Sequence, residues 1–128
     1  MPPWSRPSRD SIGHRGEAVA AAYLRRQGYR IVGLRERVLR GDIDIVALDD
    51  RTVVFVEVRS RSDLEHGHPA ETVGPSKQRR VSQRASAYIR RHKLEDCSVR
   101  IDVVTVLFHQ DGREPEVEHF QNAFDSPW

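Results

Sequence analysis

The sequence predicts an α/β domain in which one mixed β-sheet is flanked by helices. Two segments have the apolar spacing of helices, several short segments are rich in β-branched residues, and the two kinds alternate along the chain. The 128 residues are enough for one domain with a substantial core. We therefore expect a single domain over residues 11–128. Residues 1–10 contain three prolines and no apolar periodicity, which indicates a disordered tail.

The first half of the domain is predicted to be a helix followed by strands. Residues 11–27 are rich in alanine, which favours a helix, and Gly28 suits the end of that helix. Three strands are then expected, over residues 29–38, 43–48 and 53–59. Because only a short turn separates the last two, they should form an antiparallel hairpin.

The second half is predicted to contain another helix and two more strands. Residues 60–74 are expected to form a loop, and Pro75 suits the first turn of a helix that runs to about residue 93. Residues 99–108 form a further apolar strand, and residues 117–120 form a short last one. Asp102 in the apolar strand is either an inward polar anchor or a charge on an edge strand.

The predicted second helix is strongly basic. Residues 75–93 hold seven Lys or Arg and no acid, whereas residues 94–128 hold two Arg and eight acids. Such an asymmetry suggests a surface for a polyanion. Lys77, Arg80 and Arg84 lie largely off the apolar stripe of this helix and are the candidate nucleic-acid contacts. The alternative is an ordinary solvated helix face in a chain whose Arg content reflects genomic base composition.

Composition excludes several other classes. The single Cys97 cannot form an internal disulfide or a zinc site of the usual paired spacing. No apolar run approaches 18 residues, and the first residues do not form a charged and then apolar leader. We therefore expect a cytoplasmic protein without a membrane partner.

Two acids within the predicted hairpin suggest a metal site. Asp44 and Glu57 lie in otherwise apolar strands, and the tight turn should place Asp44 opposite or diagonal to Glu57. Two buried carboxylates this close repel each other unless a cation or a proton intervenes. Oxygen ligands without a Cys pair favour Mg²⁺ or Mn²⁺. Arg59 shares a face with Glu57, where it could stabilise developing negative charge on a phosphate.

Glu17 and Asp42 are further candidates near this pair. Glu17 falls on the apolar stripe of the first helix, so it either points toward the site or lies at the core edge near the helix start. Asp42 shares a face with Asp44. The competing interpretation is a hairpin stabilised by ordinary salt bridges, Asp44 with Arg59 and Glu57 with Arg61.

Several motifs together resemble a known family. They are GEAVAAAYLRRQGY from residue 16, GDIDIVA from residue 41, VFVEVRSR from residue 54, ETVGPSK from residue 71 and RIDVV from residue 100. In order and spacing, residues 12–108 are similar to the YraN-like family of small bacterial proteins. That family resembles the restriction-endonuclease-like nucleases with the PD-(D/E)XK signature and, in outline, the archaeal Holliday junction resolvases.

The resemblance implies a restriction-endonuclease-like fold and a metal-dependent endonuclease acting on DNA, including branched or repair intermediates. By position, the signature acids match Asp44 and Glu57, and the acid often found on the first helix matches Glu17. The signature lysine is Arg59 here, and arginine does not act as a general base near neutral pH. Asp42 replaces the more usual Glu, which suggests a supporting role. Resolvase-like activity would favour a homodimer. The alternative is a binding module that keeps the fold without cleaving.

Overall fold

A computed structural model of the protein describes residues 12–63 and 73–123. The two helices are α1 (Ile12–Arg26) and α2 (Pro75–Arg91). The five strands are β1 (Arg30–Val38), β2 (Gly41–Asp49), β3 (Thr52–Ser62), β4 (Ser98–Phe108) and β5 (Glu116–Phe120). The predicted tail over residues 1–10 and most of the predicted loop over residues 60–74 lie outside the described residues. No helix in the described ranges is long and apolar enough to cross a membrane.

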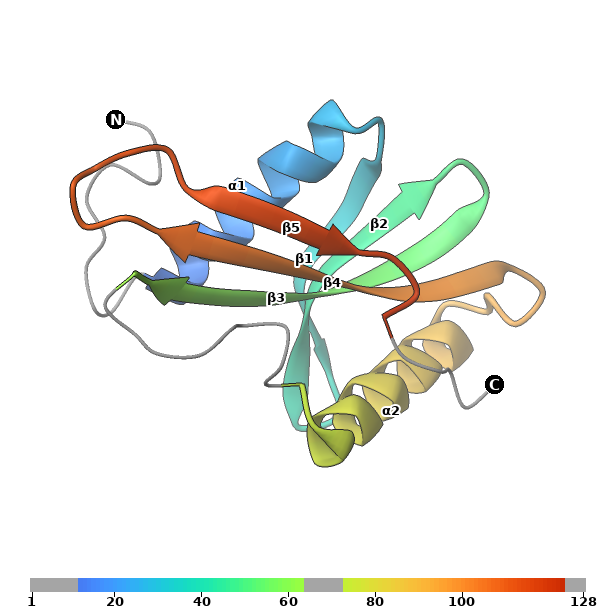
Figure 1. Ribbon diagram of the computed structural model, residues 1–128. Helices are drawn as coiled ribbons and strands as arrows, with labels where there is room; N and C mark the ends of the chain where they lie inside the picture. Colours follow the sequence, from blue (N-terminus) through green and yellow to red (C-terminus); the bar gives the residue numbers. More distant parts are fainter. Residues whose placement is uncertain (1–11, 64–72, 124–128) are drawn as a thin grey trace.

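The strands form one mixed sheet in the order β1-β2-β3-β4-β5 (Figure 1). Neighbouring strands are antiparallel except for β3 and β4, which are parallel. A parallel pair needs a crossover connection, and α2 lies within it. The expected α/β class and the mixed sheet flanked by helices are thus confirmed.

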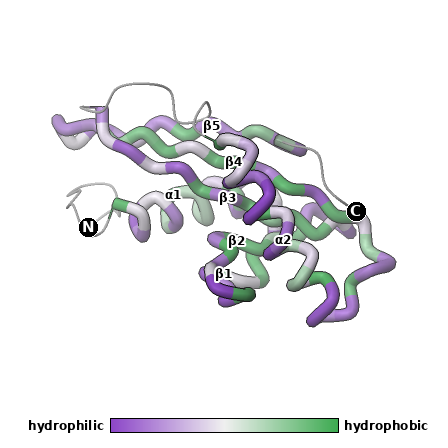
Figure 2. The backbone as a smooth tube through the Cα atoms, turned by 90° about the horizontal axis from the view of Figure 1, so that it is seen from below, coloured by the Kyte–Doolittle hydropathy of each residue, from purple (hydrophilic) through white to green (hydrophobic). Residues whose placement is uncertain are grey.

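The helices cover opposite faces of the sheet. On β3, Val54 and Val56 pack in the cluster that contains α1, whereas Val53 and Phe55 pack in the cluster that contains α2. This alternation follows from the two-residue period of a strand. Figure 2 shows hydrophobic residues recurring along the strands and a mostly hydrophilic segment between α2 and β4. Both faces of β3 are therefore buried, as its continuous apolar sequence predicts.

Two glycines allow α1 to form and pack as it does. Gly28 has φ +94°, a conformation that glycine adopts at little cost, and the Tyr29 amide donates back to the Leu24 carbonyl at 2.9 Å. Gly16 faces β3 so closely that an added Cβ would lie 1.7 Å from Ser60 Oγ. The predicted cap is confirmed, and α1 is held against the carboxyl-terminal half of β3.

One predicted boundary is wrong. The sequence predicts that residues 60–62 open a loop, but β3 continues to Ser62, which pairs with Phe108 of β4. The local sequence Ser-Arg-Ser has little strand preference. The long partner strand β4 therefore determines where β3 ends.

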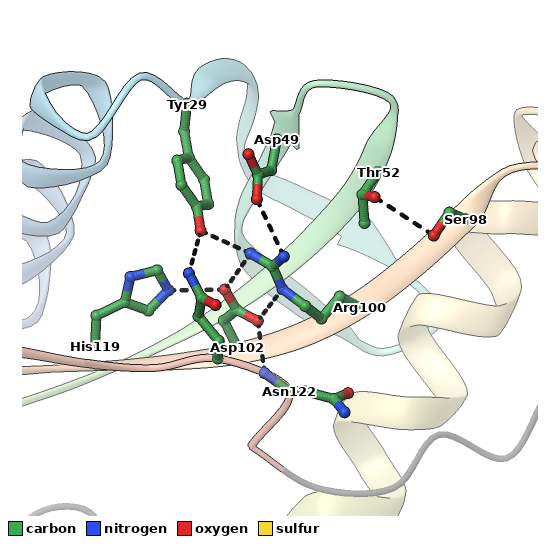
Figure 3. A network of polar contacts seen from close by, with 9 residues as sticks. Tyr29, Asp49, Thr52, Ser98, Arg100, Asp102, His119 and Asn122 are labelled. Carbon is green, nitrogen blue, oxygen red and sulfur yellow. Dashed lines mark hydrogen bonds and ion pairs between the residues drawn. The ribbon is translucent and has the colours of Figure 1, made fainter.

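A buried polar network connects the end of α1 to β4 and β5 (Figure 3). Asp102 is fully buried and accepts hydrogen bonds from Arg100 Nε at 2.8 Å and from the Asn122 amide at 3.0 Å. His119 Nε2 lies 2.7 Å from the other carboxylate oxygen, and Arg100 Nη2 donates to Tyr29 OH at 2.7 Å. Asp102 is thus the inward polar anchor rather than an edge charge.

Each partner in this network offsets the cost of burying Asp102. Burial alone would raise the pKa of its carboxyl group, but the hydrogen bonds from His119 and Arg100 outweigh burial and hold that pKa below its usual value. The network also fixes the residues that follow β5, because both Asn122 and Gln121 bond to it.

Candidate metal centre

The two strands of the central hairpin separate at Asp44. The β2–β3 ladder ends at the pair Ile45 and Val56. Ile43 packs in the cluster on the α2 side and Ile45 in the cluster on the α1 side, so the alternation of faces is interrupted at Asp44. There Asp44 Oδ2 accepts a hydrogen bond from the Val58 amide at 2.8 Å. The carboxylate therefore replaces a backbone ladder partner and is fixed against β3.

The backbone of β1 is also irregular beside Asp44. The flanking pairs of the β1–β2 ladder are Leu34 with Ile45 and Glu36 with Ile43, so Arg35 falls opposite Asp44. Arg35 has φ +49°, which is uncommon for a residue with a side chain. Such conformations recur at functional sites.

Glu57 lies on the α2 face of β3 and is only 6% exposed. Its Oε1 is 3.0 Å from Lys77 Nζ in the first turns of α2. The ion pair offsets part of the cost of burying the Glu57 carboxylate. Glu57 thus pairs with a lysine from another element.

Glu17 approaches the same region from α1. Its carboxylate forms an ion pair with Arg35, with Oε1 2.5 Å from Nε. Glu17 also acts on Asp44 electrostatically. Glu17 thus lies near enough to act on Asp44 through its charge, and its role in the site stays a prediction.

Burial and two neighbouring carboxylates perturb the titration of Asp44. Burial, followed by the charge of Glu57 and then that of Glu17, raises the pKa of Asp44 to about 7. The hydrogen bond from Val58 and the charge of Lys77 act in the opposite direction. Near neutral pH this group therefore readily takes up a proton or a cation.

The donor set of this region fits a hard divalent cation. Mg²⁺ is commonly held by one or two protein carboxylates together with water and substrate phosphates. Asp44 and Glu57 offer two carboxylates whose repulsion a cation would relieve. Among residues 12–63 and 73–123, no three His, Cys, Asp or Glu side chains are grouped closely enough to enclose an ion. The fit is thus to an open two-carboxylate site rather than to a closed structural one.

Three basic residues of α2 lie on the side of the helix that faces the sheet. Lys77, Arg84 and Arg91 are seven residues apart and therefore share one stripe. Arg84 Nη1 donates to the Asp42 carbonyl at 3.5 Å, and Arg91 Nη1 donates to the Arg37 carbonyl at 2.9 Å. This stripe therefore faces β3 and the β1–β2 hairpin, and Arg84 lies against that hairpin.

The remaining predicted residues differ in their burial and their contacts. Arg80 is exposed and donates to Ser76 Oγ at 2.9 Å. Arg59 is half-buried and lies two positions beyond Glu57 on the same face of β3. Asp42 is exposed, with Oδ1 3.7 Å from Arg37 Nη1. The structure thus brings Asp44, Glu57 and Glu17 into one region and places Asp42 and Arg84 at its margin, whereas Arg80 is exposed on α2.

The pairing of Lys77 with Glu57 was not predicted from the sequence, although the sequence carries one signal for it. A cation in the first turn of a helix is unfavourable with respect to the helix dipole, so an unusual partner is expected. The left-handed conformation of Arg35 had no sequence signal, since arginine does not favour it.

Comparison with known proteins identifies the family. Residues 16–106 match the uncharacterised protein family UPF0102. The chain belongs to this family. A UPF0102 protein of Anaeromyxobacter dehalogenans is 48% identical over 117 residues, covering 91% of this chain and 86% of that protein. Another from Arthrobacter sp. is 46% identical over 116 residues, covering 91% and 98%.

Family membership confirms the YraN-like resemblance. A UPF0102 protein of Syntrophotalea carbinolica is 44% identical over 115 residues, which is 90% of this chain and 92% of the relative. The matched region of UPF0102 includes most of α1, the central hairpin, α2 and most of β4. It therefore contains every element that contributes a side chain to the acid region.

Proposed function

We propose that the protein is a metal-dependent endonuclease with a restriction-endonuclease-like fold that acts on DNA, including branched and repair or recombination intermediates. The observation that carries the proposal is the acid pair where β2 and β3 separate. Glu57 is buried and Asp44 is half-buried there, and the two lie close enough for the charge of Glu57 to raise the pKa of Asp44. Repulsion between two acids lowers the stability of the fold, and a bound cation would remove that repulsion.

In this proposal Asp44 and Glu57 hold Mg²⁺ or Mn²⁺. When bound, such an ion polarises a phosphoryl oxygen and lowers the pKa of a coordinated water. Glu17 adds negative charge that strengthens attraction for the cation, and its ion pair with Arg35 fixes α1 beside the site. Asp42 supports the acid pair from the hairpin.

The cationic side chains serve the phosphate. Lys77 balances Glu57 in the structure, and it would turn to a phosphate oxygen once a cation neutralises that carboxylate. Arg59 stabilises negative charge on the scissile phosphate, because arginine keeps its proton. Arg80 and Arg84 contact flanking phosphates, which would make DNA affinity strongly salt-dependent.

The proposed DNA substrate implies a cellular compartment and an oligomeric state. A DNA-cleaving protein of a bacterium acts in the cytoplasm. Cutting two strands of a branched junction requires two copies of the site, so the proposal includes a homodimer with two-fold symmetry.

A cleavage assay tests the proposal. Wild type, Asp44→Asn, Glu57→Gln and the control Asp50→Asn are incubated with branched, nicked, single-stranded and duplex DNA in Mg²⁺, Mn²⁺ or EDTA. Asp50 is exposed in a turn with φ +54°, which Asn tolerates, so the control should leave activity unchanged. We expect metal-dependent cleavage by wild type and the control, and loss of cleavage with DNA binding retained in the two site variants.

A thermal measurement adds a readout that does not depend on cleavage. A ligand that binds the folded state raises its stability according to concentration and affinity. Mg²⁺ or Mn²⁺ should therefore raise the Tm of wild type more than that of Asp44→Asn or Glu57→Gln. Equal changes in Tm for all variants would place the ion elsewhere.

The second candidate function is a binding module that no longer cleaves. Two observations favour it: Arg59 stands where the signature has lysine, and the Lys77 ammonium already neutralises Glu57. Salt-dependent DNA binding by wild type, with no cleavage of any substrate under any metal, would establish this function and reject the nuclease.

A further inference from the structure

Three side chains form a row across the α2 face of the sheet. In the parallel β3–β4 ladder Glu57 is opposite Val103, and in the antiparallel β4–β5 ladder Val103 is opposite Phe120. Directly opposed residues point to the same face of a sheet. Strands are about 4.8 Å apart, so Phe120 lies about 10 Å from Glu57. A carboxylate, an aliphatic and an aromatic side chain are thus neighbours.

An open groove of about 500 Å³ lies over the Val103 and Phe120 end of this row. Its described lining consists of Val73, Gln78, Val103 and residues 120–123. Gln78 directly follows Lys77, which contacts Glu57, and Val103 is the ladder neighbour of Glu57. The groove therefore begins beside the acid region, and its volume is within the range of small-molecule sites, roughly 300–1,000 Å³.

The chemistry of the lining suits a nucleobase. Phe120 offers an aromatic ring, Val103 is 3% exposed and forms an apolar floor, and Gln78 and Asn122 bring amide groups. Aromatic rings stack on the face of an unstacked base, and amides hydrogen-bond to its edge. The described residues that line the groove include no carboxylate, so none repels the phosphates of a nucleotide.

The wall of the groove after β5 is held in place by the core. The Asn122 amide donates to Asp102 Oδ1 at 3.0 Å, and the Ala123 amide donates to the Ile101 carbonyl at 2.9 Å. With φ +50° at Asn122, its side chain turns away from the buried network and toward α2 (Figure 3). On the opposite rim, Gln78 Nε2 donates to the Val73 carbonyl at 2.9 Å. Both rims are thus preformed.

We propose that this groove binds an unstacked nucleobase of the DNA strand whose phosphate lies at Asp44 and Glu57. The inference rests on the proposed function and specifies its substrate: DNA with unpaired nucleotides next to the scissile phosphate. A base within a duplex hides both faces by stacking, so only an unpaired or extruded base can enter the groove and contact Phe120.

The test measures binding in EDTA, so that metal-dependent cleavage plays no part. Wild type is titrated onto a single-stranded oligonucleotide carrying 2-aminopurine and onto the fully paired duplex of the same sequence. We expect wild type to quench the fluorescence of the unpaired base. Phe120→Leu, which keeps apolar bulk but loses the ring, should abolish quenching and weaken single-strand binding about 5- to 100-fold.

Two further variants control for folding. Phe120→Trp keeps an aromatic face and should retain quenching and affinity. Asn122→Gly tolerates φ +50° and keeps the amide that bonds to Asp102, so it removes only the side-chain amide and should weaken single-strand binding selectively. Duplex binding should be unchanged in all variants.

The proposal is overturned if Phe120→Leu binds single strands as wild type does, or if it weakens duplex and single-strand binding equally. Failure of the nuclease proposal is a separate result, namely wild type that cleaves nothing. Quenching that depends on Phe120 would then still assign the groove to an unpaired base in a non-cleaving protein.

Discussion

Replacing Asp44 by Asn should stabilise the fold at neutral and alkaline pH. Burial and the charges of Glu57 and Glu17 raise the pKa of Asp44 from 3.8 to about 7. In the unfolded chain the group ionises near its ordinary value, so raising the pH through this window makes folding progressively less favourable. Two pKa values that differ by one correspond to about 1.36 kcal/mol, so the rise to about 7 costs the folded state about 4 kcal/mol once Asp44 is ionised.

The variant removes this cost while keeping the local geometry. Asn has nearly the same shape, and its side-chain oxygen can still accept the hydrogen bond from Val58. We expect a gain of about 2–4 kcal/mol at pH 8. At pH 4 the gain should approach zero, since Asp44 is then largely protonated in the folded state.

Urea unfolding in EDTA at several pH values between about 4 and 8 measures the difference. Asp50→Asn is the matched control, because this exposed turn residue should show a difference near zero at every pH. If Asp44→Asn is less stable than wild type at pH 8, or differs from it by the same amount at all pH values, Asp44 does not lie among like charges as described.

Substitutions also test three other contacts. Gly16→Ala should cost about 1–3 kcal/mol because its methyl group meets β3, whereas Gly13→Ala, with nothing within 4 Å, should gain up to about 1 kcal/mol; thermal unfolding of both compares them. Lys77→Met should cost about 1–3 kcal/mol in urea unfolding, since Glu57 loses its partner at a site where Lys77 is 27% exposed. Asp102→Asn should cost about 2–4 kcal/mol at pH 7. Because the pKa of the Asp102 carboxyl is lowered in the folded state, the cost should shrink as the pH falls below the ordinary pKa of 3.8. A cost that does not change with pH would contradict the network.

Much of the fold follows from local patterns in the sequence. The alanine-rich run with Gly28 at its end, the β-branched alternation on both sides of the 49–51 turn and Pro75 at a helix start each specify structure within a few residues. The same periodicity placed Asp44 and Glu57 near each other, since a two-residue turn leaves little freedom of register. These predictions needed no long-range information.

Other features depend on contacts that sequence spacing does not encode. The extension of β3 to Ser62 is imposed by β4, and the alternation of faces that predicted a shared face for Asp42 and Asp44 is interrupted where β2 leaves β3. Lys77 reaches Glu57 only because the crossover brings α2 over the sheet. The groove beside Glu57 is likewise formed by segments from β4, β5 and α2. Such tertiary placements require the topology first.

The two ladders of β3 differ in how far apart their partners are along the chain. Asp49 and Thr52 close the hairpin with β2, whereas Thr52 and Ser98, 46 residues apart, begin the pairing with β4. Local hairpins form early in folding, and distant parallel pairings form late. Asp44 and Glu57 should therefore meet while water still screens them, and their repulsion should grow only when the helices close over the sheet. A substitution that relieves this repulsion should then slow unfolding more than it speeds folding, so the acid pair limits the lifetime of the native state.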